Sequence, residues 1–428
     1  MEKPPKITKE IESKALDLLN SNAQFAILAD KANEDYGYWS DLKYKVKAPI
    51  QPEVFWAAIK IKRSACRIIH TPVADFRFLL TATIEKICFD ICEAIGDKSH
   101  CGSLVNFAKD FEFLMKNEIS YEAISSSVME GAATTRKVAL EMIGKRKPPK
   151  NVSERMIWNN YLAMQYIIDN CEKDIDASML LEIHRIVTER TLDNPEDELC
   201  FRGNNNIDVV DTENSESVHT PPSYEKIAET VDWLCRFINN ETGPFVNPVI
   251  KAIIAHFSLS YLHPFVDGNG RTARALFYFC MAKAGYPFVK YISISTAISF
   301  KRRQYDKAFL ECENDNLDIG YFILYHLKMV YNAIEWTKGK ISKSKDEARR
   351  EIDKYRKGLS PMQSEIIGKM VSGDWLYADA ASVCLLLNVS HPTAMKLLKE
   401  LERLGLIERT QHGKRKQTFV LSDVEIKL

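Results

Sequence analysis

Residues 263–274 constrain the fold of this chain more than any other segment, because they read His-Pro-Phe-Val-Asp-Gly-Asn-Gly-Arg-Thr-Ala-Arg. Apolar residues recur at helical spacing up to Leu262, and Pro264 disfavours helical backbone at the residue before it. We therefore expect a helix to end at His263, with this histidine in an extended conformation. A second helix is expected over 271–283. The Asp-Gly-Asn-Gly turn between the two can adopt positive φ values, which would point several backbone N–H groups toward one anion.

The same segment combines residue types that suit the binding of a polyphosphate. Arg271 and Arg274 are three positions apart and so lie on one face of the second helix, where their planar donor groups match phosphate oxygens. The start of that helix adds the positive end of its dipole. His263, with an ordinary pKa of about 6.5, can accept the proton of a nucleophile near neutral pH. The plainer alternative is a solvent-exposed helix–turn–helix without a catalytic role.

The segment resembles the signature of the Fic family of nucleotidyl transferases, chiefly AMP transferases, which is His-x-Phe-x-Asp/Glu-Gly-Asn-Gly-Arg-x-x-Arg. Every fixed position is filled. The resemblance implies transfer of AMP from Mg·ATP to the hydroxyl of a Ser, Thr or Tyr, in a target protein or in this chain itself. It implies that His263 is the base and that Asp267 is the ligand of Mg²⁺. The other nucleotide contacts would come from Gly268, Asn269, Gly270, Arg271 and Arg274, with the loop backbone and the Asn269 side chain on the α-phosphate and the arginines on the β- and γ-phosphates.

This resemblance extends over roughly residues 30–330. In relatives, the helix after the signature often carries Tyr-Tyr-x-Ala-Leu, and this chain has Tyr305 followed by Asp306. Tyr305 is accordingly expected on the adenine side of the nucleotide. Some relatives use a downstream asparagine there, and Glu313 and Asn314 compete for that position. Adenine is the base that the family implies.

A second motif precedes the signature. Residues 126–131, Ser-Ser-Val-Met-Glu-Gly, match the (Ser/Thr)-x-x-x-Glu-(Gly/Asn) motif of the self-inhibited class of Fic proteins, with Ser126, Glu130 and Gly131 at its fixed positions. The resemblance implies that Glu130 pairs with Arg274 and removes the guanidinium that should hold the γ-phosphate. In this class the same glutamate can orient water for the removal of AMP from a modified protein. Dimers are common in the class, so a homodimer is also implied.

Within residues 176–335, the stretch 205–220 contains the one β-hairpin that the sequence indicates. Ile207 and Val209 alternate with polar neighbours, and the Asp-Thr-Glu-Asn-Ser-Glu-Ser stretch that follows is typical of a loop. In Fic proteins a hairpin "flap" follows a Phe/Tyr-Arg element, here 201–202, and docks the target segment by β-augmentation. The residues expected to dock the target are Asn206, Ile207, Asp208 and Val209. A plain surface hairpin is the alternative.

Helical periodicity dominates the chain, so we expect a mainly α fold. With the resemblance, this becomes a Fic-type helical bundle with a small β-hairpin flap and a C-terminal winged helix–turn–helix. Five segments are expected: a helical cap (1–75), a helical region with the inhibitory motif (76–175), the catalytic core (176–336), a charged linker or helix (337–358) and the winged helix (359–428). Residues 76–95 are expected to form one helix.

The sequence pattern of residues 359–428 predicts three helices, at 363–371, 378–387 and 392–404. Two strands follow, at 406–409 and 418–421. This order resembles a winged helix–turn–helix. Basic residues between the strands, Lys414, Arg415 and Lys416, could contact DNA phosphates while residues 390–399 enter a major groove. Winged helices also mediate protein contacts, and both interpretations stay open.

The composition of the chain limits which partners and which cellular location we expect. Lys+Arg and Asp+Glu balance at 58 each, so no bulk charge favours nucleic acid or membrane, and a DNA site would have to be a local patch. The ten cysteines lack a Cys-x-x-Cys pair or zinc spacing and are interpreted as reduced thiols, mostly in the core. Neither a secretory signal nor a membrane span is indicated, so we expect a cytoplasmic protein without membrane contact.

The predicted function is therefore protein AMP transfer restrained by Glu130. One alternative is a Fic relative that moves UMP, phosphocholine or a phosphoryl group, although the intact Gly-Asn-Gly-Arg argues against the phosphoryl variant. The other is a DNA-binding regulator whose Fic core senses nucleotide. Further histidines are expected to be structural, since His256 lies on an apolar helix face and His184 and His219 lack partners with recognisable spacing.

Overall fold

A computed structural model of the chain describes residues 1–96, 112–210, 217–356, 359–371, 375, 377–412 and 416–421. The protein is mainly helical and divides into two compact units. One is formed by Met1–Asn106 with Phe113–Thr337, and the other mainly by Lys338–Leu428. The division falls within helix α16 (Gly320–Arg356), so the segment expected as a charged linker or helix continues this helix. Among the described helices, none is both long and apolar enough to cross a membrane.

The N-terminal part of the first unit contains helices and one small hairpin. Its elements are α1 (Lys9–Ser21), α2 (Ala23–Glu34), α3 (Trp39–Leu42), α4 (Pro52–Arg63), β1 (Arg67–His70), β2 (Asp75–Phe78) and α5 (Ala82–Ile95). The antiparallel β1–β2 hairpin corrects the helix expected over 76–95. That helix begins only after Thr81, whose hydroxyl accepts a hydrogen bond from the Ile84 N–H and caps it. The domain boundary expected after residue 75 therefore cuts through β2.

Buried charges join this N-terminal part to the rest of the first unit. Arg63 of α4 is 3% exposed, and its Nη1 lies 3.4 Å from the Asp318 carboxylate. Lys60, one turn earlier on α4, pairs with Asp315 at 2.9 Å. The backbone of Arg77 in β2 also bonds the chain on either side of Asp318. Segment 1–75 is therefore an integral part of the first unit.

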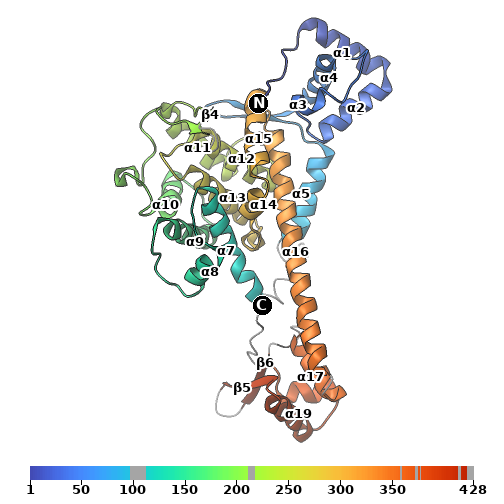
Figure 1. Cartoon of the computed structure of the whole chain (residues 1–428), viewed down its shortest axis with the longest axis vertical. Coiled ribbons are helices and arrows are strands. Elements are labelled where there is room, and N and C mark those ends of the chain that lie inside the picture. Colours follow the sequence, from blue (N-terminus) through green and yellow to red (C-terminus); the bar gives the residue numbers. More distant parts are fainter. Residues whose placement is uncertain are drawn as a thin grey trace. The chain divides into compact units, whose positions relative to one another are not determined.

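The core of the first unit is built on α12 (Pro248–Leu262) and α13 (Asn269–Lys283), which lie among the other helices in Figure 1. α12 is buried nearly all round, which is why its sequence is apolar on every face. The Asn247 side chain and Pro248 start it. The remaining elements, where η marks a short 3₁₀ helix, are α7 (Glu112–Met129), α8 (Arg136–Gly144), α9 (Val152–Asn170), α10 (Ala177–Thr188), η2 (Pro195–Asp197), β3 (Val209–Val210), β4 (Ser217–His219), η3 (Tyr224–Lys226), α11 (Ile227–Ile238), η4 (Pro287–Tyr291), α14 (Ile294–Ser299) and α15 (Arg302–Asn314).

The second unit has its own core of short elements. They are α17 (Pro361–Val371), α18 (Ala380–Leu387), α19 (His391–Arg403), β5 (Ile407–His412) and β6 (Lys416–Leu421). The two strands form an antiparallel hairpin, and each strand extends further toward the turn than expected. Ile366 of α17, Val383 of α18 and Leu398 of α19 are buried together with Phe419 of β6. A shared hydrophobic cluster of this kind is what allows such a small unit to be compact.

Candidate active site

Helix α12 ends at Leu262, and His263 closes it. The backbone of His263 is left-handed, with φ 49° and ψ 58°, and its N–H bonds the carbonyl of Leu259 at 2.9 Å. The extended conformation expected from Pro264 is therefore wrong, because this residue serves instead as a left-handed helix cap. The cap turns the chain sharply, so the loop to α13 begins directly beside the imidazole.

The imidazole of His263 is half-buried, and its two nitrogens are not equivalent. Nδ1 lies 3.2 Å from the carbonyl oxygen of Ser260. A carbonyl oxygen only accepts, so Nδ1 carries the proton and Nε2 keeps its lone pair. Nε2 has no hydrogen-bond partner in the described part of the chain. Burial lowers the pKa of His263, so the ring is neutral at neutral pH, which is the form that a general base requires.

The loop after His263 is closed by its own side chains. Asn269 is 3% exposed, accepts a hydrogen bond from the Phe265 N–H at 3.0 Å and donates to the Phe265 carbonyl at 2.8 Å. Both polar atoms of this amide thus help to close the loop, and its expected contact with the α-phosphate stays a prediction. Gly268 has a φ of 81°, and a Cβ there would lie 2.5 Å from the Thr188 methyl. α13 begins at Asn269, earlier than expected, so the backbone N–H groups of its first turn lie at this loop.

Arg271 connects the loop to helix α10. One of its Nη atoms donates to the Val187 carbonyl at 2.9 Å, and the other lies 3.1 Å from Asp267 Oδ2. The residue is 2% exposed, and its Nε finds no acceptor among the described residues. Two of its nitrogens are thus engaged by protein oxygens, and the phosphate contact expected for Arg271 stays a prediction.

Asp267 is the exposed carboxylate of the loop. Its side chain is 57% exposed although Oδ1 accepts a hydrogen bond from the Gly268 N–H at 2.6 Å. Mg²⁺ usually binds through one or two carboxylates together with substrate phosphates, and a single accessible carboxylate fits that mode. Within the described residues no group of three or more His, Cys, Asp or Glu could hold a metal without a substrate.

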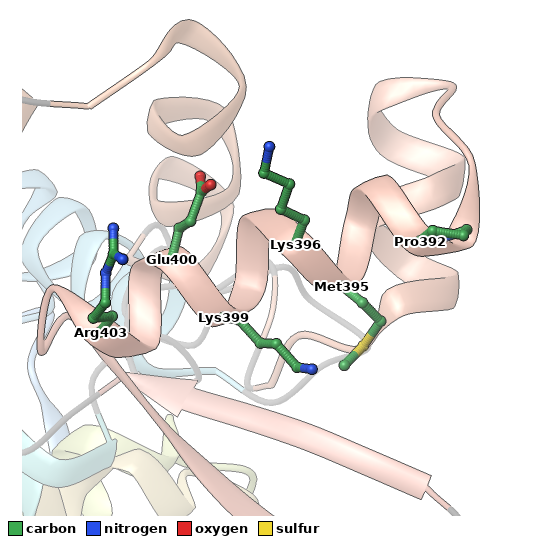
Figure 2. A pocket seen from close by; sticks show the side chains of 6 residues that line it. All are labelled: Pro392, Met395, Lys396, Lys399, Glu400 and Arg403. Carbon is green, nitrogen blue, oxygen red and sulfur yellow. The ribbon is translucent and has the colours of Figure 1, made fainter.

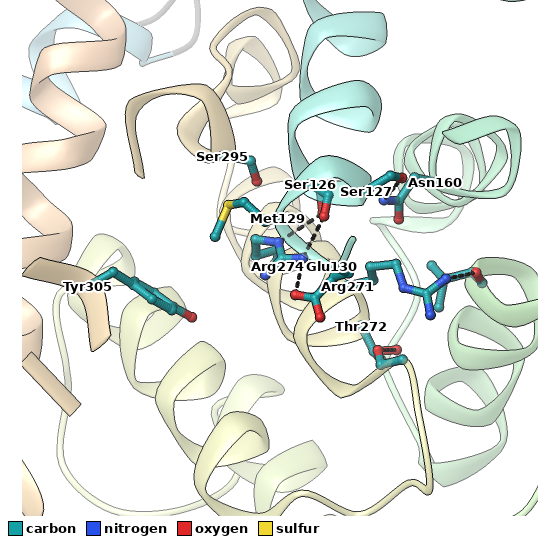
Figure 3. A network of polar contacts seen from close by, with 12 residues as sticks. Ser126, Ser127, Met129, Glu130, Asn160, Arg271, Thr272, Arg274, Ser295 and Tyr305 are labelled. Carbon is teal, nitrogen blue, oxygen red and sulfur yellow. Dashed lines mark hydrogen bonds and ion pairs between the residues drawn. The ribbon is translucent and has the colours of Figure 1, made fainter. Parts of the chain in front are cut away.

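Glu130, directly after α7, lies against the start of α13, as Figure 3 shows. Arg274 donates from Nη2 to Glu130 Oε1 at 2.8 Å, and from Nε and Nη2 to the hydroxyl and carbonyl of Ser126 at 2.8 and 2.9 Å. A Cβ on Gly270 would clash with the same Oε1. Burial alone would raise the pKa of Glu130, but the surrounding guanidiniums, chiefly that of Arg274, hold it below its ordinary value. An ionised carboxylate therefore occupies the anion-attracting end of α13.

Two contacts that sequence reasoning missed fix the end of α7. Asn160 of α9 donates to the hydroxyl of Ser127, which is fully buried, at 2.9 Å. Arg302 of α15 donates to the Met129 carbonyl at 3.2 Å. Gly131 then ends the segment with a φ of 91°, a conformation that explains the glycine of the motif. The motif itself carries no signal for Asn160 or Arg302, which lie elsewhere in the chain.

A third missed residue, Glu122, holds the middle of α7. It is 3% exposed and accepts hydrogen bonds from the Ser295 N–H at 2.9 Å, from the Ser295 hydroxyl at 2.5 Å and from the Ser293 hydroxyl at 3.0 Å. Nearby, the hydroxyls of Ser125 and Thr296 lie 2.7 Å apart. α7 is therefore attached to the start of α14 by a buried carboxylate as well as to α13 by Glu130.

Tyr305, expected on the adenine side of the nucleotide, lies in the core of the first unit. It is 6% exposed, and its hydroxyl lies 3.0 Å from Nε2 of His256. Burial raises the pKa of Tyr305 to about 12, so this hydroxyl stays protonated. His256 is fully buried and also contacts His326 at 3.0 Å, in agreement with a structural role. Glu313, one candidate for the missing asparagine, pairs instead with His219 at 2.8 Å.

The hairpin expected at 205–220 is present as β3 and β4, although its strands are short. Asn206 and Asp208 are exposed, and Ile207 and Val209 are half-buried. The Thr220 hydroxyl donates to Asp208 at 3.0 Å across the hairpin. Residues 211–216, which connect the strands, lie outside the described residues.

Arg202 joins the hairpin to the loop after His263. It is 4% exposed and donates to the carbonyls of His263 at 2.8 Å, Asn204 at 2.7 Å and Pro222. Its backbone N–H also bonds the Pro264 carbonyl at 2.9 Å. Sequence reasoning noted this arginine only as part of a Phe/Tyr-Arg element, and its contact with the His263 backbone is visible only in the structure.

The basic cluster expected in the second unit is only partly described. Lys414 and Arg415 lie outside the described residues, and Lys416 is the first residue of β6. Residues 390–399, expected to enter a major groove, form the cap and first turns of α19.

Comparisons with known proteins agree with this geometry. The Fic/DOC family model matches residues 174–281, which contain the whole signature. Protein adenylyltransferase Fic of Drosophila melanogaster is 36% identical over 128 residues, which are 29% of this chain and 24% of that protein. Protein adenylyltransferase fic-1 of Caenorhabditis briggsae is 46% identical over 68 residues, 15% of this chain and 13% of that protein. The matched region thus spans about a quarter or less of the length of these relatives.

One solved structure extends the comparison beyond the signature. The crystal structure of a Fic family protein from Desulfovibrio desulfuricans G20 is similar with a TM-score of 0.53 and 18% identity, and the match covers 83% of this chain and 99% of that one. At this identity the likeness concerns the fold. The mainly helical Fic-type fold predicted from the sequence is therefore confirmed.

Proposed function

Residues 174–281 of this chain form a domain of the Fic/DOC family, and on that premise we propose that the protein transfers AMP from ATP to a hydroxyl group of a protein. The observation that carries the proposal is Nε2 of His263, which has no partner among the described residues, at the start of the loop that leads to α13. The adenylyltransferase relatives support AMP as the group transferred. The acceptor is a Ser, Thr or Tyr of a target protein or of this chain.

In the proposed reaction, Nε2 of His263 takes the proton of the acceptor hydroxyl while the hydroxyl oxygen bonds to the α-phosphorus. The bond from that phosphorus to the bridging oxygen breaks, and pyrophosphate leaves. Backbone N–H groups and the dipole at the start of α13 stabilise charge on the α-phosphate. Asp267 would hold Mg²⁺, which supplies positive charge beside the departing pyrophosphate. The chain contributes positioning and electrostatics rather than covalent chemistry.

We further propose that Glu130 restrains this reaction. While Arg274 pairs with Glu130 at 2.8 Å, its guanidinium is not free to bind the γ-phosphate. The carboxylate also repels an anion that approaches the start of α13. A triphosphate displaced by about 1 Å can react on the order of 10²-fold more slowly. The same ionised carboxylate can orient water for the removal of AMP from a modified protein.

The test measures incorporation of label from α-labelled and γ-labelled ATP into the purified chain and added proteins. Glu130→Gly is expected to raise α-label incorporation well above the wild type, and His263→Ala in that background should abolish it. Glu130→Gln keeps the size of the side chain but not its charge, so it should give an intermediate gain. Label from γ-labelled ATP would establish phosphoryl transfer instead. A Glu130→Gly variant that incorporates no α-label overturns the proposal.

The flap provides a docking edge for the acceptor segment in this proposal. Asn206 and Asp208 are exposed beside β3, and Arg202 fixes the hairpin to the backbone of His263. A target strand that pairs with the hairpin would bring its hydroxyl toward the imidazole.

The rival function is a regulator whose Fic domain only senses nucleotide. That function predicts that His263→Ala, which leaves the loop intact, does not change the sensing of nucleotide.

A further inference from the structure

The second unit contains two helices joined as in a helix–turn–helix. α18 ends at Leu387 and α19 begins at His391, so three residues connect them. Asn388 has a φ of 52°, a left-handed conformation that an asparagine tolerates and that permits so tight a turn. The β5–β6 hairpin follows α19 closely. In DNA-binding proteins with this arrangement, the second helix of the pair enters the major groove.

α19 has one buried face and one open face. The buried face consists of Ala394, Leu397, Leu398 and Leu401, which pack into the core of the unit. On the open face, Lys396, Lys399 and Arg403 are exposed at the spacing of successive helical turns. Figure 2 shows these three among the six side chains that line a pocket along the helix, with Pro392, Met395 and Glu400.

Cations outnumber anions among the side chains that line this pocket, since Glu400 is the one acidic residue beside the three cations. In the part of the chain that the structure describes, none of the three pairs with a carboxylate. The two glutamates of α19 have partners elsewhere: Glu400 accepts a hydrogen bond from Gln363 at 2.9 Å, and Glu402 lies 3.6 Å from Arg409. A row of cations without acidic partners is complementary to a polyanion.

We propose that this open face of α19 binds duplex DNA in the major groove. The helix has 13 residues and is therefore about 20 Å long, and a major groove about 12 Å wide admits a helix. Lys396, Lys399 and Arg403 meet phosphates, and the exposed His391 and Thr393 of the first turn reach base edges. Duplex RNA fits less well, because side chains cannot read its deep and narrow major groove. This binding is independent of AMP transfer.

Fluorescence anisotropy tests the proposal with the full chain and a labelled duplex of mixed sequence, titrated at several salt concentrations. The wild type is expected to bind, with an affinity whose logarithm falls linearly with the logarithm of the salt concentration. The triple variant Lys396→Gln/Lys399→Gln/Arg403→Gln should lower the magnitude of that slope by roughly 2 to 3, since each phosphate contact contributes about 0.9. The matched control Lys31→Gln/Lys86→Gln/Lys137→Gln removes three exposed cations of the first unit and should leave the slope unchanged.

Each other outcome overturns the proposal. Absence of salt-dependent duplex binding at low salt excludes the site, and an equal loss in both triple variants would show that net charge alone is responsible. Tighter binding to duplex RNA, or to vesicles with anionic lipids, would assign the face to a different partner. Thermal melting followed by circular dichroism checks the fold of each variant. If the triple variant melts early, Lys399→Gln alone should still lower the slope by about 0.9.

Discussion

The backbone conformation of His263 decides which of its nitrogens is reactive. Because the residue caps α12 in a left-handed conformation, its Nδ1 faces the Ser260 carbonyl in the last turn of the same helix. The helix therefore fixes the tautomer, and Nε2 is left as the basic nitrogen. In many enzymes a separate carboxylate orients the base, whereas in the proposed reaction the end of a helix orients it.

The pH dependence of the proposed AMP transfer should reflect this half-buried imidazole. Burial lowers the pKa of His263, so the neutral form persists below pH 6.5, the ordinary value for histidine, and activity is lost only as the pH falls through the lowered value. The acid limb of kcat/KM for Glu130→Gly, measured with α-labelled ATP, should have its midpoint below about 6.5. His263→Ala should lower the rate by about 10²- to 10⁴-fold and remove this limb. A midpoint above 6.5 would contradict the assignment.

Arg202 should be important for stability as well as for the position of the flap. Arg202→Ala would leave the carbonyls of His263, Asn204 and Pro222 without their charged donor, in hydrogen bonds that are all partly buried. Each such loss costs about 1–3 kcal/mol, so we expect destabilisation of at least 2 kcal/mol in chemical denaturation. Arg185→Ala is the matched control. Its ion pair with Glu182 is partly exposed, and the expected cost is below about 1 kcal/mol. Equal effects of both substitutions would refute the role of Arg202.

Among the structural elements, those with local signals could be predicted from the sequence. α12 and α13 followed from apolar spacing, Pro264 and the glycines between them, and the Glu130–Arg274 pair expected from two motifs is formed. Features set by distant partners could not be predicted. The β1–β2 hairpin lies against the backbone beside Asp318, far along the chain.

Single side chains of the candidate site were harder to assign than the helices that carry them. An asparagine in a glycine-rich loop suits a phosphate in the sequence, yet the Asn269 amide closes its own loop. The Tyr305 ring is covered by helices packed around it. Hydrogen-bond partners depend on the three-dimensional approach of segments, which residue spacing does not contain.

Helix α7 carries both Glu122 and the segment that ends in Glu130. The proposed restraint by Glu130 should therefore weaken when the contacts of Glu122 in the middle of the helix are lost. Glu122→Gln keeps the size of the side chain but loses charge-assisted hydrogen bonds from Ser293 and Ser295. We expect α-label incorporation to rise, by less than in Glu130→Gly. Hydrogen exchange in α7 should become faster at the same time.

The double variant Glu122→Gln/Glu130→Gly separates this coupling from a general loss of stability. If Glu122 acts through the position of Glu130, the double variant should be no more active than Glu130→Gly alone, because the restraining carboxylate is already absent. Additive gains, or faster exchange without any change in activity, would show that Glu122 does not act on the brake.

For the whole molecule, the separate cores predict two unfolding transitions. The second unit has its own buried cluster, and proteins with several compact units usually depart from two-state unfolding. The unfolding enthalpy grows with the number of residues, so the larger transition in calorimetry belongs to the unit that contains the Fic domain.

A ligand stabilises only the unit that binds it and therefore raises the temperature of that unit's transition. At 100 times its Kd, a ligand adds about 2.7 kcal/mol to the free energy of unfolding. Mg·ATP should therefore shift the larger transition, and more in Glu130→Gly than in the wild type, because no carboxylate then competes at the start of α13. Duplex DNA should shift only the smaller transition, and not in the Lys396→Gln/Lys399→Gln/Arg403→Gln variant. A single transition that both ligands shift equally would show that the two units unfold as one, and would contradict their independence.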